Sequence, residues 1–93
     1  MPDDELTSVR PAPNVLFQEL EGETVLLHMG TERYYGLNEV GTRFWQLLTE
    51  HGSTQAALNQ MLMEFEVDEP TLRADLARLL SELAAARLVI VQD

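Results

Sequence analysis

The side chains that could carry out catalysis are few, and they lie far apart in the sequence. There is no cysteine, so the chain offers neither a thiolate nucleophile nor a disulfide. The serines Ser8, Ser53 and Ser81 fall in an amino-terminal tail, at a helix start and inside a helix, with no histidine placed to activate them. His28 and His51 fall in different predicted elements and lack the close ligand pairs of zinc sites. These residues predict no active site and no metal site.

Phosphate binding and acid–base catalysis are not indicated either. The glycines stand apart and form neither a G-x-x-x-x-G-K loop nor a G-x-G-x-x-G turn. Neighbouring carboxylates, such as Asp3 with Asp4 and Glu64 with Glu66, have no surrounding polar constellation, so exposed charge explains them better. The sequence therefore predicts a protein that is not an enzyme and that needs no cofactor.

Acidic residues dominate the charge of the chain. Sixteen of them against six basic residues give a net charge of −10. A surface of this sign repels a phosphate backbone, so nucleic acid is a poor partner. The acid serves either solubility or the steering of a basic peptide or partner enzyme, an effect that salt weakens.

The sequence shows no signal for export or membrane insertion. Its first residues are acidic where a secretory signal is basic. The most apolar stretch, residues 83–91, is interrupted by Arg87 and is far shorter than the roughly 20 residues of a membrane helix. We therefore expect a cytoplasmic protein without a membrane partner.

Ninety-three residues fit one small domain, which we expect to begin near Asn14. Residues 1–13 combine acid, three prolines and few large apolar groups, which predicts a flexible acidic tail. The remaining part, residues 14–93, begins with runs of β-forming side chains at residues 15–20, 24–29 and 33–37. A turn at residues 21–23 joins the first two runs as a hairpin, and the three together predict an antiparallel meander.

Three helices are expected after the meander. Asn38 is a preferred N-cap and stands where the apolar spacing changes from two to about 3.6 residues. Gly52 ends this first helix, and Ser53 caps the second. Asp68 begins the third and longest helix, and residues 88–91 predict a short closing strand. The predicted fold class is α+β, a winged helix-turn-helix-like domain with a three-stranded antiparallel meander, three helices and a short closing strand.

The third predicted strand, residues 33–37, could accept a peptide. If it lies at the edge of the meander, its unpaired N–H and C=O groups are a template for another strand, and Gly36 leaves the backbone open to close approach. Tyr34 and Tyr35 must point to opposite faces of the sheet, so one ring stays available at the surface. The third helix would form the other wall, with pockets for alternate peptide side chains.

An arc of leucines marks one side of the third helix. Leu72, Leu76, Leu79 and Leu83 follow one another at spacings of four, three and four residues. Such a stripe normally fills the core, and this simpler interpretation remains open for Leu72, Leu79 and Leu83. Asp75 lies at the margin of the arc, where its carboxylate is either a solvated edge or an acceptor of hydrogen bonds from a bound peptide.

Several segments follow one another in a distinctive order. They are the turn Glu21-Gly22-Glu23, the strand from Arg33 to Leu37, the stretch Leu37-Asn38-Glu39-Val40-Gly41 with Phe44-Trp45, and Ala74-Asp75-Leu76 ahead of Leu88-Val89. From about Val15 to Val91 the chain resembles the PqqD-like proteins, which are the leader-binding recognition elements of ribosomally made, modified peptides. It looks most like the free-standing versions that serve lasso-peptide biosynthesis.

This resemblance implies a non-catalytic protein that captures the leader of a precursor peptide as a strand added to residues 33–37, beside the third helix. It also implies presentation of the leader to a cysteine-protease-like leader peptidase, with the macrocycle-forming ATP-dependent cyclase as a further partner. The backbone of residues 33–37 would supply the ladder hydrogen bonds, and Arg33 and Asp75 would add polar anchoring. The predicted peptide-binding residues are Arg33, Tyr34, Tyr35, Gly36, Leu37, Leu72, Asp75, Leu76 and Leu79.

Other functions stay open at this point. One is a peptide chaperone of a pyrroloquinoline-quinone-type pathway that serves a radical enzyme, although residues 28–32 lack the proline-containing wording associated with that pathway. The others are a winged-helix DNA regulator, for which the third helix offers few basic residues, and an adaptor that pairs with itself through the exposed strand. Arg87 also stands where family members often place glycine, which disfavours a left-handed helix cap there.

Overall fold

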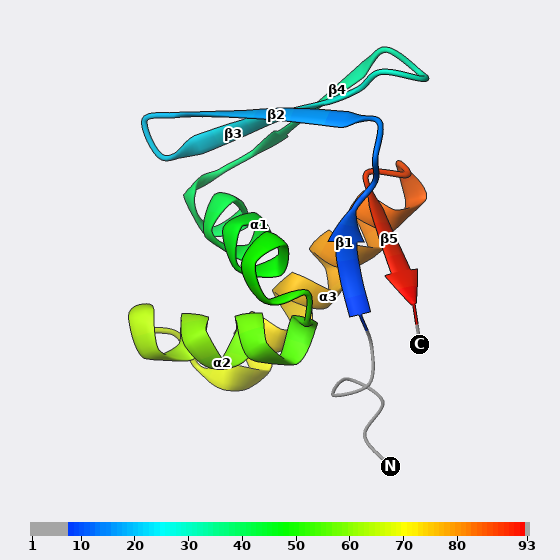
Figure 1. Cartoon of the computed structure of the whole chain (residues 1–93). Helices are drawn as coiled ribbons and strands as arrows, with labels where there is room; N and C mark the ends of the chain where they lie inside the picture. Colours follow the sequence, from blue (N-terminus) through cyan, green and yellow to red (C-terminus); the bar gives the residue numbers. More distant parts are fainter. Residues whose placement is uncertain (1–7, 93) are drawn as a thin grey trace.

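Two antiparallel sheets and three helices make up residues 8–92, the part of the chain that this computed structural model describes (Figure 1). In chain order the elements are β1 (Ser8–Pro11), β2 (Val15–Leu20), β3 (Glu23–His28), β4 (Arg33–Leu37), α1 (Glu39–His51), α2 (Thr54–Glu64), α3 (Glu69–Ala85) and β5 (Val89–Gln92). This order confirms the predicted α+β class, with a three-stranded meander followed by three helices and a short closing strand.

The meander is the sheet that positions the candidate site. Its strand order is β2-β3-β4, with antiparallel pairing throughout. Glu21 and Gly22, with φ of 53° and 83°, form the tight connection between β2 and β3, because left-handed residues at both turn positions match the twist of the two strands. Within residues 8–92, β4 pairs only with β3, so its other side is a free edge, which meets the condition set for strand addition in the sequence analysis.

The start of the fold differs from the prediction. Ser8–Pro11, which the sequence placed in a flexible tail, forms β1 and pairs antiparallel with β5. Val9 is buried, and the Ala12 N–H donates a hydrogen bond of 3.0 Å to the Leu88 carbonyl. The nearby prolines argued against a strand in the sequence. Both strands of a two-stranded sheet are edge strands, however, and proline is tolerated there. The rest of the predicted tail, residues 1–7, lies outside the described residues.

The helix starts follow the predicted caps. The side chains of Asn38, Ser53 and Asp68 each accept a hydrogen bond from the backbone N–H three residues further on, at 2.9, 3.2 and 3.3 Å. Each bond satisfies a donor that the first helical turn leaves unpaired. Gly52, with φ of 69°, ends α1 in the left-handed conformation.

Helix α3 ends in a left-handed cap although the residue is not glycine. Arg87 has φ of 62°, its N–H donates to the Ala84 carbonyl at 3.0 Å, and the next N–H, of Leu88, donates to the Leu83 carbonyl at 2.9 Å. This pair of hydrogen bonds is the Schellman motif, which an apolar contact at the helix end usually accompanies. Leu83 and Leu88 are both buried and belong to the core. Burial of these leucines offsets the backbone cost of a left-handed arginine.

The core lies between the meander and the helices. Figure 1 shows α1 against one face of the sheet, with no helix over the opposite face. Thr24 of β3 and Thr42 of α1 share a buried hydrogen bond of 2.9 Å, and Phe17 of β2 packs edge-on against Trp45 at 5.5 Å between ring centroids. No helix among the described residues has both the length and the apolar character needed to cross a membrane.

Candidate functional site

A groove of about 340 Å³ opens where the chain leaves β4 and enters α1. One wall is the start of α1, and the other is one side of α3. We call it the β4–α3 groove, and its lining residues are Asn38, Val40, Gly41, Asp75, Leu76, Arg78, Leu79 and Glu82. Its lining combines aliphatic side chains with carboxylates, an amide and one guanidinium.

Gly41 explains why α1 can lie close to the end of β4. A Cβ atom at this position would come within 3.3 Å of the Leu37 Cβ and 3.4 Å of the Asn38 Oδ1. Those distances are tighter than ordinary van der Waals contacts, so a side chain would push the first turn of α1 away from the strand. Glycine therefore lets the first turn of α1 lie close to Leu37, the last residue of β4.

Tyr35 joins β4 to the opposite wall of the groove. Its hydroxyl donates a short hydrogen bond to the Glu82 Oε1 on α3. That bond to a carboxylate, followed by burial and by the negative charge of Glu82, raises the pKa of the Tyr35 hydroxyl above its usual value. Tyr34 is 73% exposed on the other face of the sheet, which confirms that the two tyrosines point in opposite directions.

The polar side chains at the groove are exposed. Asp75 accepts a hydrogen bond of 3.4 Å from the Arg78 guanidinium, one turn further along α3. The Arg33 side chain is also exposed, and within residues 8–92 no hydrogen bond or ion pair holds it. Asp75 could turn to a ligand at little cost, because an exposed ion pair of this kind stabilises a fold weakly. Among the described residues, Arg33 has no such bond to break.

The structure brings together some of the residues predicted from the sequence. Asp75, Leu76 and Leu79 line the groove, and Tyr35 contacts its wall through Glu82. Leu37 and Leu72 are buried in the core and do not line it, whereas Arg33, Tyr34 and Gly36 are exposed on β4, outside the lining. Binding of a peptide by any of these residues stays a prediction.

Several groove residues were missed in the sequence, namely Asn38, Val40, Gly41, Arg78 and Glu82. Helical spacing could have found Glu82, since it follows Leu79 by three residues and Asp75 by seven on the same side of the helix. The groove residues at the start of α1 had no such signal in the sequence, because their place in the groove depends on how closely that helix approaches α3.

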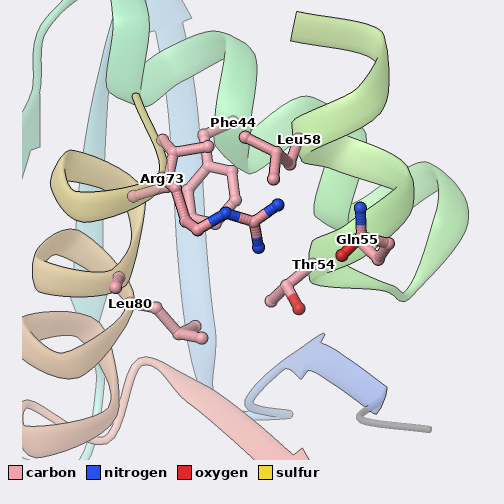
Figure 2. Close-up of a pocket in the computed structure, with 8 residues that line it drawn as sticks. Phe44, Thr54, Gln55, Leu58, Arg73 and Leu80 are labelled. Atoms are coloured by element: carbon pink, nitrogen blue, oxygen red, sulfur yellow. The ribbon is translucent and has the colours of Figure 1, made fainter. Parts of the chain in front are cut away.

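A second pocket, of about 110 Å³, lies between the three helices on the other side of Leu76 (Figure 2). Its lining is mainly apolar, with Phe44, Leu58 and Leu80 facing inward, and Arg73 reaches across it from α3. The Arg73 guanidinium is held by Glu69 at 2.7 Å.

Among residues 8–92 no group of three or more histidine, aspartate or glutamate side chains is placed to hold a metal ion. The free edge of β4 and the groove beside it suit an extended peptide.

A comparison with the sequence profiles of protein families shows which family the chain belongs to. The sequence profile described as coenzyme PQQ synthesis protein D (PqqD) matches residues 23–89, from the start of β3 into β5. The chain belongs to the PqqD family. The match includes β4 and both walls of the groove, so the resemblance noted in the sequence is confirmed.

One solved structure has the same fold as this PqqD-family chain and a similar sequence. It is described as TbiB1 in complex with the TbiA(beta) leader peptide. The two chains are 35% identical and align with a TM-score of 0.82 over 86% of this chain and 93% of that one. No curated protein matches the sequence.

Proposed function

We propose that this protein binds the leader segment of a ribosomal precursor peptide as an additional strand on β4, beside α3, and presents it to a leader peptidase in lasso-peptide biosynthesis. The observation that carries the proposal is the free edge of β4 directly beside the β4–α3 groove. A strand added at such an edge gains main-chain hydrogen bonds, and pockets for alternate side chains select its sequence.

The similarity to TbiB1 supports the choice of ligand. That protein was solved in complex with a leader peptide, and it is 35% identical to this chain over most of both lengths. An extended leader would place every second side chain against the groove, where Leu79 and Val40 offer apolar contact. Asp75 and Arg33 would hold polar groups of the leader at the two ends of this contact.

Titration by fluorescence polarisation tests the proposal. The ligand is the labelled leader of the precursor peptide encoded beside this protein, and a scrambled leader of the same composition is the control. Binding in the low-micromolar range or tighter, which the scrambled peptide lacks, is the expected result. Equal binding of both peptides would point to non-specific attraction and would contradict leader recognition.

A pair of α3 variants locates the leader. Asp75→Ala and Glu69→Ala each remove an exposed carboxylate that is paired with an arginine one turn further along the helix, at 3.4 and 2.7 Å. Only Asp75 lines the groove. We expect weaker leader binding for Asp75→Ala alone, with both variants folded. If Asp75→Ala binds the leader as tightly as the wild type, its role in binding is wrong.

The family profile supports one second candidate, a peptide chaperone for a radical enzyme in a pyrroloquinoline-quinone-type pathway. Both candidates bind a precursor on β4, so the titration does not separate them. Adding the protein–precursor complex to the purified leader peptidase does. Faster leader removal with the complex than with the precursor alone supports the lasso pathway, and an unchanged rate favours the chaperone.

A further inference from the structure

No helix covers the face of the meander that is turned away from α1 (Figure 1), and most of its side chains are apolar. The strand register places on this outer face five apolar or aromatic side chains, those of Leu16, Leu20, Val25, Leu27 and Tyr34, together with Gly36 and the polar side chains of Gln18 and Glu23. Leu16, Leu20, Val25 and Tyr34 are 57%, 62%, 44% and 73% exposed. The solvent face of an antiparallel sheet normally carries polar side chains, and a contiguous apolar surface is typical of an interaction site.

Gly36 adds a depression to the outer face. A Cβ atom built there would meet no other atom within 4 Å, so the fold itself does not require glycine at this position. The residue lies opposite Val25 in the register and at the free edge of β4. An incoming side chain could therefore approach the backbone closely at the boundary between the sheet and an added strand.

The outer face is continuous with the proposed leader site. A strand paired with β4 places alternate side chains on the two faces of the sheet, so those that do not enter the groove extend the outer face next to Tyr34 and Gly36. A partner on this face would contact the sheet and the leader together. This inference rests on the proposed function.

Charge decides between the possible occupants. The exposed carboxylate of Glu23 lies on the outer face, those of Glu21 and Glu32 lie in the two turns of the meander, and the whole chain carries a net charge of −10. Two copies stacked through this face would bring like charges together, whereas a basic rim on another protein would be attracted. We propose that the outer face docks the enzyme that processes the precursor, through an apolar surface bordered by lysine and arginine, and that the bound leader completes the docking surface.

The test uses a double variant on the strand furthest from the leader. Leu16→Thr with Leu20→Thr removes apolar surface from β2 and keeps residues that favour a strand. Met63→Thr, at an 80% exposed position on α2, is the matched control. Three quantities are measured on the full chain: the leader affinity, the affinity of the purified leader peptidase for the protein–leader complex, and the sedimentation of the protein alone.

The expected result separates the two binding events. The double variant binds the leader like the wild type, but its complex binds the peptidase at least about tenfold more weakly, as the loss of two exposed leucines from the docking surface predicts. Met63→Thr changes neither affinity. Undiminished peptidase binding by the double variant overturns the inference, as does a wild-type dimer that the double variant abolishes. Failure of the wild type to bind any leader would instead contradict the proposed function.

The charge and leader requirements have their own readouts. Glu21→Gln with Glu23→Gln is expected to slow peptidase association several-fold at low ionic strength, with the difference shrinking as salt is added. An association rate equal to that of the wild type at every salt concentration would show that the peptidase does not meet these carboxylates with lysine and arginine. Equal peptidase affinity with and without the leader would show that the bound leader is not part of the docking surface.

Discussion

Two neighbouring leucines on α3 provide the sharpest test of where the leader binds. Leu79 and Leu80 are both partly buried, but Leu79 lines the β4–α3 groove and Leu80 lines the pocket between the three helices. Replacing either by alanine removes the same group from a similarly exposed site on the same helix. The two variants should therefore lose similar stability and differ in leader affinity.

The magnitudes follow from burial. Complete burial of the groups that alanine lacks contributes about 2.4 kcal/mol, at about 0.8 kcal/mol for each methylene equivalent. Because each leucine is about two-thirds or more buried in the free protein, the free energy of unfolding should fall by about 1.6 kcal/mol or more in either variant. A leader seated in the groove would cover at most the remaining third of Leu79, so Leu79→Ala should also lose up to about 0.8 kcal/mol of binding energy, a Kd up to about fourfold higher.

Stability and binding are measured separately. The fluorescence of Trp45, the single tryptophan and a buried one, follows unfolding in urea, and polarisation of a labelled leader gives the Kd. Leu80→Ala should bind the leader like the wild type despite its lower stability. Equal losses of affinity in both variants would mean that stability alone controls binding, and an unchanged Kd for Leu79→Ala would place the leader outside the groove.

Three further predictions concern the fold. Arg87→Gly should raise the unfolding midpoint by several degrees, because it relieves about 1 kcal/mol of left-handed backbone cost, whereas Ala86→Gly, at φ of −83°, should lower it. Gly36→Ala should stabilise β4 by about 0.5–1 kcal/mol in a urea titration, and a loss instead would show that the outer face is not open there. Hydrogen bonds from Arg43 hold the pKa of Glu64 at about 2, below 4.5, so their stabilising effect is present above pH 4.5 and lost as the pH falls toward 2. Glu64→Gln should remove that part of the pH dependence of thermal unfolding, and an unchanged profile would contradict it.

Local patterns predicted the elements well because they depend on nearby residues. Asn38, Ser53 and Asp68 mark helix starts through bonds that span three residues, and the β-forming runs predicted the three strands of the meander. Strand β1 escaped notice because its pairing with β5 joins opposite ends of the chain, and Pro11 argued against a strand.

The candidate site was only partly visible in the sequence for a similar reason. Periodicity showed which leucines share one side of α3, but it could not show that Leu79 lines the groove while Leu72 is buried, because that depends on how the helices pack. The left-handed Arg87 was missed because glycine preference describes backbone cost alone, and the burial of Leu83 and Leu88 offsets that cost.

Backbone amide hydrogen exchange on residues 33–37, with and without the leader, tests the central claim most directly. If the leader adds a strand to β4, exchange should slow by about tenfold or more at alternate positions, those whose N–H groups point away from β3, while α2 stays unchanged. Unchanged exchange along β4 at a saturating leader concentration, or protection confined to α2 and the pocket beside it, would contradict strand addition.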